Sequence, residues 1–371
     1  MSEIKAAHIP GMSIGKIVDV LSFSYLSLIE KNIKFKEFPS VMLWGPPGVG
    51  KSQAVREIAE KIEKGSGKKV NVTDVRLLLF NPIDLRGIPT ANEDKTLAIW
   101  LKPQIFQMDP SPDCVNILFL DEISAAPQSV QAAAYQITLD RVVGEHKLPD
   151  NCIVIAAGNR VTDKSVSFKM PKALSNRLMH IEAETNFESW KQWAVSKGIN
   201  EKVMGYLAFS PKSLMNFGSS GDDLAYATPR TWELVSNVLN NVCDDVDKMY
   251  DLISGLIGSG SAVEFASWTK VYKDIPNVED IFDGKKANVP KNTSTLYALS
   301  SSIVSCAKKH KDDLDKIANS IDYISKLPPD FSVLILKDYL YIEDNYKSKL
   351  NKIPEFGKWF SKIGSLLNAI D

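Results

Sequence analysis

One stretch of the sequence, residues 45–52 (GPPGVGKS), constrains the fold most, because it fits the phosphate-binding pattern G-x-x-x-x-G-K-[ST]. The apolar residues 41–44 precede it, and residues 53–61 have the composition of a helix. In a strand, glycine turn and helix of this kind, backbone N–H groups and the positive end of the helix point at one place. The pattern therefore predicts a nucleoside triphosphate site, and the alternative is a glycine-rich turn that binds nothing.

Within this stretch, Lys51 is expected to reach the β- and γ-phosphates of ATP as a positive charge. The Ser52 hydroxyl is expected to ligate the Mg²⁺ ion that bridges these phosphates. The residues predicted to bind the nucleotide are Gly45, Pro46, Pro47, Gly48, Val49, Gly50, Lys51, Ser52, Gln53 and Asp121.

Two further apolar runs end in polar residues: residues 115–120 precede Asp121 and Glu122, and residues 152–158 precede Asn159. Fully apolar strands are typical of a covered parallel sheet, which binds its ligands at the carboxyl ends of the strands. Asp121 is therefore expected to share the Mg²⁺ ion with Ser52. We expect Glu122 to deprotonate the attacking water and Asn159 to position that water. The alternative is a strand that ends in solvated acids.

Further strands are predicted over residues 70–79 and 179–183. The predicted fold class is therefore α/β, a P-loop three-layer αβα sandwich with a parallel sheet. Residues 1–37 have apolar positions at a spacing near 3.6, which predicts a helix leading into this domain. From residue 186 onward helical periodicity dominates and predicts an α-helical domain.

Four segments lie outside these main elements. Residues 81–103 are predicted to form an inserted loop or hairpin, which is either functional or a solvent-exposed decoration, and residues 139–151 a second small hairpin. In the helical part, residues 276–293 are expected to form a loop and residues 331–350 a helix.

Three arginines are candidates for contact with phosphate. Arg160 follows Asn159 and is either a phosphate-sensing group or a surface charge. Arg177 precedes the last strand, and in a ring it could reach the γ-phosphate of a neighbouring subunit; the alternative is a surface ion pair. Arg230 follows Thr228 and Pro229, which signal the start of a helix, and it could reach back to the nucleotide.

Composition excludes several other classes of protein. The 44 basic and 45 acidic residues nearly cancel, so no overall field draws the chain to nucleic acid or to an anionic membrane. No apolar run is long enough to cross a bilayer, and residues 1–20 lack a secretory signal, so a cytoplasmic location is expected. Neither disulfides nor a zinc site is predicted from the scattered Cys114, Cys152, Cys243 and Cys306. Structural or surface roles are expected for His8, His146, His180 and His310.

The order and spacing of these motifs resemble those of the AAA+ ATPases, and among them the MoxR-like and dynein-related group, over roughly residues 39–240. Residues 45–52 look like the Walker A motif and residues 117–122 like Walker B. Three single residues match further family positions: sensor 1 (Asn159), the arginine finger (Arg177) and sensor 2 (Arg230).

The resemblance implies a catalytic set of Glu122, Asn159, Arg177 and Arg230, a helical lid after the sandwich, and a hexameric ring of identical subunits. It also implies that residues 81–103 and 139–151 are the insert and hairpin that face the pore or substrate. The domains expected from it are a helical lead (1–38), a nucleotide-binding domain (39–185), a lid (186–310) and a C-terminal extension (311–371).

We therefore hypothesise a Mg²⁺-dependent ATPase that remodels or activates a protein partner, for which MoxR-like relatives suggest a protein with a von Willebrand A domain. The balanced charge argues mildly against an ATPase that acts on nucleic acid. A nucleotide-gated scaffold without useful turnover fits poorly with Glu122, Asn159 and Arg177. A small-molecule kinase shares the phosphate-binding loop but seldom needs the remaining residues.

Overall fold

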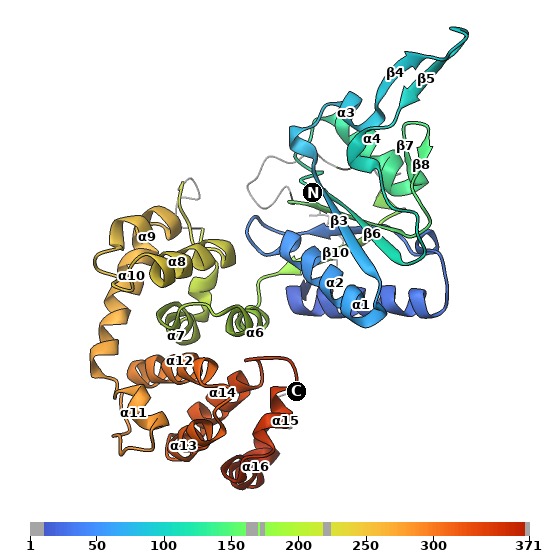
Figure 1. The fold of residues 1–371 in the computed structure, drawn as a ribbon. Coiled ribbons are helices and arrows are strands. Elements are labelled where there is room, and N and C mark those ends of the chain that lie inside the picture. Colours follow the sequence, from blue (N-terminus) through green and yellow to red (C-terminus); the bar gives the residue numbers. More distant parts are fainter. Residues whose placement is uncertain (1–10, 161–169, 171–174, 218–223, 368–371) are drawn as a thin grey trace, which may run out of the picture. The chain divides into compact units, whose positions relative to one another are not determined.

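In the computed structural model the chain forms two compact units, Met1–Asn186 and Phe187–Asp371 (Figure 1). The structure describes residues 11–160, 170, 175–217 and 224–367. The finer domain boundaries expected at residues 38 and 310 stay predictions. No helix among the described residues has the length and apolarity needed to cross a membrane.

The first unit is built on a parallel six-stranded sheet in the order β1-β10-β2-β9-β6-β3. Its strands are β1 (Gly11–Ser13), β2 (Val41–Trp44), β3 (Lys69–Arg76), β6 (Cys114–Asp121), β9 (Cys152–Gly158) and β10 (Met179–Glu184). This sheet confirms the predicted α/β class. The short strand β1 was not predicted from the sequence.

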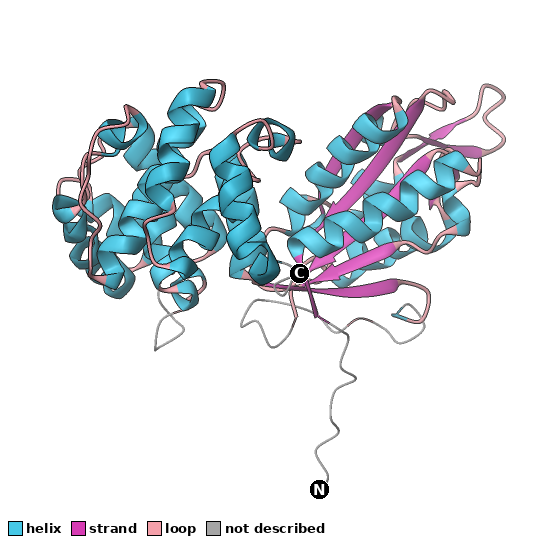
Figure 2. Cartoon of the chain, turned by 90° about the horizontal axis from the view of Figure 1, so that it is seen from below, coloured by secondary structure: helices cyan, strands magenta, loops and turns pink. Residues whose placement is uncertain are grey.

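Helices cover both faces of this sheet, as Figures 1 and 2 show. The helices α1 (Ile14–Glu30) and α2 (Lys51–Ser66) pack on one face, and α4 (Gln128–Asp140) packs on the other. Alternate residues of β6 enter the two cores, Ile117 and Phe119 on the α1 and α2 side and Leu118 and Leu120 on the α4 side. A strand buried on both faces needs such a continuous apolar sequence.

The strands β2 and β3 are parallel, as expected from their connection through α2, but they are not neighbours, because β9 and β6 lie between them. All seven residues of β9 are buried, whereas most of β3 is partly or fully exposed. The more apolar strands therefore occupy the centre of the sheet, and β3 is an edge strand.

The two predicted hairpins form and touch each other. Residues 81–103 contain α3 (Pro82–Arg86) and the antiparallel strands β4 (Ile88–Ala91) and β5 (Ala98–Leu101), which project from the unit in Figure 1. The second hairpin pairs β7 (Val142–Val143) with β8 (His146–Lys147). A 2.8 Å contact from His146 Nε2 to the Trp100 carbonyl oxygen joins the two hairpins.

The second unit is helical and is packed around one large apolar core. Its helices are α6 (Phe187–Lys197), α7 (Glu201–Phe209), α8 (Pro229–Asn241), α9 (Tyr250–Ile257), α10 (Ser259–Thr269), α11 (Val278–Phe282), α12 (Thr293–Lys309), α13 (Leu314–Ile324), α14 (Pro329–Tyr339), α15 (Tyr346–Leu350) and α16 (Pro354–Leu367).

Two expectations for this unit are wrong. The expected loop at residues 276–293 contains α11, which begins after Asn277, whose side chain accepts a hydrogen bond from the Glu279 N–H. Residues 331–350 form two helices rather than one, because α14 ends at Tyr339 and Asn345 adopts a left-handed conformation with a φ of 62° before α15. Such a residue interrupts a right-handed helix.

Candidate nucleotide site

The phosphate-binding pattern forms a turn between β2 and α2, and α2 begins at Lys51, two residues before the expected start. Gly45 and Gly50 have backbone φ angles of +156° and +111°, which residues other than glycine rarely adopt. A Cβ atom at Gly45 would lie 2.8 Å from the Ala183 carbonyl oxygen on β10. The glycines therefore let the loop lie close against the neighbouring strand, as a phosphate cradle requires.

Lys51 is buried, with 8% of its surface exposed, and its ammonium group is held by three neutral oxygen atoms. Lys51 Nζ donates to the carbonyl oxygens of Gly45 (2.6 Å) and Pro46 (3.0 Å) and to Asn159 Oδ1 (2.9 Å). The structure therefore places a lysine charge inside the glycine loop, beside the end of β9. This arrangement fits a phosphate chain.

The two predicted metal ligands lie together. Ser52 Oγ donates a hydrogen bond to Asp121 Oδ2 at 3.0 Å, and Asp121 Oδ1 accepts one from the Glu122 N–H at 2.8 Å. A hydroxyl and a carboxylate are hard oxygen ligands of the kind that Mg²⁺ prefers beside substrate phosphates. The residues present thus fit the ion expected from the sequence.

Glu122 has an unusual backbone for a glutamate, with a φ of 58° in the left-handed region. The hydrogen bond from its N–H to Asp121 supports this conformation. The helix α4 begins only at Gln128, because residues 122–126 form turns and a bend that carry the chain away from the strand end.

Asn159 follows β9, which pairs with β6, so it stands at the same sheet edge as Glu122. Its backbone N–H donates to Ser124 Oγ at 2.9 Å, and its side chain accepts from Lys51. A Cβ atom at the preceding Gly158 would lie 2.8 Å from Ser124 Oγ. Ser124, which sequence reasoning did not single out, thus fixes the position of Asn159.

A second residue missed from the sequence is Asp74 on β3. Burial raises the pKa of its carboxyl group, and the nearby Asp121 carboxylate raises it further. The paired register of β3 and β6 explains this proximity, since Val75 lies opposite Leu120. The only signal in the sequence was an acid in the middle of a predicted strand.

Arg177 lies at the amino ends of the strands, opposite the carboxyl ends where the phosphate-binding loop lies. It precedes β10, whose first residue pairs with the first residue of β2, whereas the phosphate-binding loop follows the last residue of β2. Arg177 is exposed and lines a surface hollow of about 460 Å³ together with Lys36, Arg141 and Lys147. His180 Nε2 donates to the Ser175 carbonyl oxygen at 2.7 Å, which ties down the turn before Arg177.

The other two arginines belong to other segments of the chain. Arg160, for which the sequence left open a phosphate-sensing role or a surface charge, forms an ion pair with Glu182 on β10. Arg230 is exposed in the first turn of α8, where the Thr228 hydroxyl accepts a hydrogen bond from the Thr231 N–H at 3.2 Å. Because Arg230 belongs to the second unit, its reach to the nucleotide stays a prediction.

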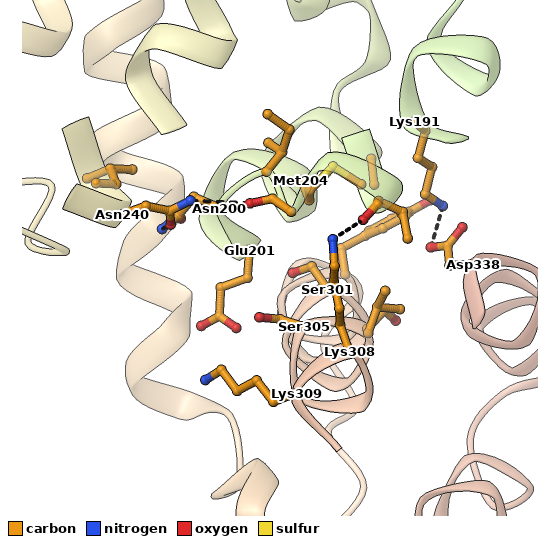
Figure 3. Close-up of a pocket in the computed structure, with 18 of the residues that line it drawn as sticks. Lys191, Asn200, Glu201, Met204, Asn240, Ser301, Ser305, Lys308, Lys309 and Asp338 are labelled. Atoms are coloured by element: carbon orange, nitrogen blue, oxygen red, sulfur yellow. Dashed lines mark hydrogen bonds and ion pairs between the residues drawn. The ribbon is translucent and has the colours of Figure 1, made fainter. Parts of the chain in front are cut away.

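A separate polar cavity of about 290 Å³ lies within the second unit (Figure 3). The buried Lys191 and Asp338 form an ion pair of 2.8 Å beside it, and Lys308 donates to the Val195 and Ser196 carbonyl oxygens at the end of α6. Burial raises the pKa of Asp338 to about 6, although Lys191 opposes this shift. No motif in the sequence indicated this cavity.

The comparisons with known proteins agree with the geometry of the first unit. Residues 40–180 match the family model "ATPase family associated with various cellular activities (AAA)". No curated protein sequence matches the chain.

Three solved structures are among those with some similarity to this chain. A RuvB mutant from Thermotoga maritima is 14% identical, with 80% of this chain and 86% of that chain covered and a TM-score of 0.35. NtrX from Brucella abortus in complex with ATP is 13% identical, with 95% and 70% covered and a TM-score of 0.34. Hsp104 with ATPγS and casein is 15% identical, with 65% and 46% covered and a TM-score of 0.40.

The assignment of the fold depends on the family match, the strand order and the loop geometry. All three concern the same part of the chain. Residues 40–180 thus match the family model of the AAA ATPases and have a P-loop α/β fold.

Proposed function

We propose that this chain is a Mg²⁺-dependent ATPase of the MoxR-like AAA+ type. It forms a ring and couples hydrolysis of ATP to ADP and phosphate to the remodelling or activation of a protein partner. The observation that carries this proposal is that the predicted catalytic residues of the first unit lie at both ends of the strands, some at the carboxyl ends and one at the amino ends of the same sheet. Glu122 and Asn159 lie at the edge with the phosphate-binding loop, and Arg177 lies at the other.

At the loop edge, each side chain has a distinct task. Lys51 holds the β- and γ-phosphates, and Ser52 and Asp121 hold Mg²⁺, which when bound neutralises phosphate charge. The Glu122 carboxylate accepts a proton from the attacking water. The Asn159 amide, fixed through Ser124, orients that water.

The opposite edge completes the site of a neighbouring subunit. A guanidinium that precedes β10 lies a strand's length from the phosphate-binding loop of its own sheet, so it acts on another copy of the chain. The hollow beside Arg177, which four basic and two acidic side chains line, supplies a net positive charge for that contact. Head-to-tail contacts of this kind close into rings.

The test is complementation between two inactive variants. Lys51→Ala cannot hold phosphate but keeps Arg177, and Arg177→Ala keeps an intact phosphate-binding loop. If Arg177 acts on the neighbour, an equal mixture regains ATPase activity, up to about a quarter of the wild-type rate for random assembly in a ring. The matched control mixes Arg177→Ala with the double variant Lys51→Ala/Arg177→Ala, which can supply no arginine and restores nothing.

Light scattering shows whether mixed assemblies form. Recovery in the test mixture alone supports the ring and the shared site. Mixed assemblies without recovery would make Arg177 a surface charge, and a monomer in all conditions, including Glu122→Gln with Mg-ATP, would remove the ring.

The insert supports a protein client rather than nucleic acid. Eight large apolar side chains are at least 38% exposed on residues 78–105: Leu78, Leu79, Ile83, Ile88, Leu97, Ile99, Leu101 and Ile105. Some of them line an apolar groove of about 480 Å³ at the base of the β4–β5 hairpin. The same segment has three acidic and three basic residues, so it lacks the basic patch of a nucleic-acid site. An exposed apolar surface of this kind suits a protein.

Ile83→Asp tests this surface, with Leu252→Asp on α9 as a control, because the two side chains are 59% and 57% exposed. Basal ATPase activity should be unchanged in both. Stimulation by a purified von Willebrand A domain should be lost only in Ile83→Asp. Stimulation by DNA, retained in both variants, would favour the nucleic-acid alternative.

A further inference from the structure

Three metal-ligating side chains meet in the second unit, far from the nucleotide-binding loop in the sequence. Among the residues that the structure describes, Glu279, Cys306 and His310 form a group in which one ligand atom of each lies within 4.8 Å of the others. Cys306 and His310 are four residues apart at the end of α12, so they lie on one face of the helix. Glu279 comes from α11.

The three side chains already face one another. Glu279 Oε2 and His310 Nε2 are 2.9 Å apart, and the Cys306 side chain is buried beside them. The His310 ring packs on Phe282 with 5.9 Å between ring centroids, which limits its rotation. The Glu279 side chain is 51% exposed and that of His310 25% exposed, so an ion can enter from solvent.

We propose that Glu279, Cys306 and His310 bind a divalent transition-metal ion, of which Zn²⁺ is the best match. Thiolate, imidazole and carboxylate are the three ligand types that proteins use for zinc, and three ligands leave the fourth tetrahedral position for water. Mg²⁺ and Ca²⁺ are excluded because they bind oxygen ligands rather than thiolate. This site is independent of the proposed ATPase function.

The surroundings accept a cation. Lys316 Nζ is 3.1 Å from Asp283, and Lys285 Nζ is 2.6 Å from Asp280, so carboxylates balance these two lysines, while Lys309 is a further positive charge near Cys306. The bound ion joins the five-residue helix α11 to the end of α12. It therefore acts as a clip between two segments that are otherwise joined by the His310–Glu279 contact and by packing. The rival interpretation is an ordinary ion pair between His310 and Glu279 beside a buried thiol.

Titration of the full-length chain with Co²⁺, followed by its absorption spectrum, tests this site. Co²⁺ replaces zinc and shows a thiolate charge-transfer band only when sulfur is a ligand, so cobalt held by oxygen at Ser52 and Asp121 gives no such band. The expected result is one equivalent of thiolate-bound cobalt that Zn²⁺ displaces. Cys306→Ser should abolish the band, and the control Cys243→Ser should keep it.

Glu279→Gln and His310→Gln change partly exposed side chains, so they keep the test decisive even if Cys306→Ser does not fold. Each should weaken Zn²⁺ binding, measured by calorimetry, by more than about 100-fold, because a lost ligand costs more than the loss of an outer partner. Absence of the band in the wild type, its survival in Cys306→Ser, or unchanged zinc affinity in both glutamine variants would overturn the proposal.

Discussion

Each unit of the molecule contains a buried lysine, and the two lysines have different kinds of partner. Lys51 donates to two carbonyl oxygens and an amide oxygen, all neutral. Lys191 is paired with the carboxylate of Asp338 at 2.8 Å, and both side chains are less than 8% exposed. A buried carboxylate that loses its lysine is left without a counter-charge, which destabilises the folded chain strongly. The first arrangement suits a ligand site, and the second maintains the fold.

The largest predicted effect is the loss of nucleotide binding in Lys51→Ala. Without the ammonium group, ATP affinity should fall by roughly a thousandfold, about 4 kcal/mol, while the unfolding free energy changes little. Calorimetric titration with ATP and chemical denaturation measure the two quantities. Unchanged affinity would remove the assignment of the phosphate-binding loop.

An effect of the same size is expected for Glu122→Gln, which separates binding from chemistry within the same site. The amide cannot accept the proton of the attacking water, so turnover should fall by about 10³. Affinity for ATP should stay near the wild-type value. Steady-state phosphate release and equilibrium binding check both parts, and a variant with near-normal turnover would assign the base to another residue.

Lys191→Ala is the counterpart of Lys51→Ala in the helical unit. It leaves Asp338 buried without its ion-pair partner, so the unfolding free energy should fall by about 3 kcal/mol. ATP affinity should be unchanged. The double variant Lys191→Met/Asp338→Leu is a matched control, since replacing both charges with apolar groups should recover most of the lost stability. If it does not, the pair has a function besides packing.

A change of pH is expected to alter the unfolding free energy by a smaller amount, about 2–3 kcal/mol. Burial raises the pKa of Asp338 from 3.8 to about 6, so between these values the folded chain binds a proton that the unfolded chain does not. The contribution of Asp338 to stability is therefore complete below about pH 4 and is lost as the pH rises through 6. Asp338→Asn should remove this pH dependence. The measurement is the unfolding free energy of the wild type and of the variant at pH 4 and at pH 7.

The comparison also explains what the sequence could predict. Parallel strands bring their carboxyl ends to one edge, so Lys51, Asp121 and Asn159 could be placed together from apolar runs and a glycine loop alone. The order of the strands across the sheet could not be predicted, because the connection through α2 does not reveal that β9 and β6 lie between β2 and β3. Ser124 and Asp74 were missed because their roles depend on neighbours across that sheet.

In the helical unit, periodicity predicted the helical class but none of the polar sites. Residues such as Lys191 and Asp338, or Glu279 and His310, come together only through the packing of helix faces that are distant in sequence. The short helix α11 lies in a segment rich in Pro, Asn, Asp and Gly, for which the sequence predicted a loop, so its Glu279 was not recognised as the partner of His310. Scattered Cys and His residues therefore gave no zinc signal.

The left-handed backbone at Glu122 has a consequence for engineering. A glycine at this position would adopt the same φ of 58° without the penalty of about 1–2 kcal/mol that other residues carry there. Glu122→Gly should thus make the folded chain more stable while removing the carboxylate. A laboratory selection for heat resistance alone would tend to enrich inactive protein at this position, so directed evolution of this domain needs a turnover screen alongside the thermal one.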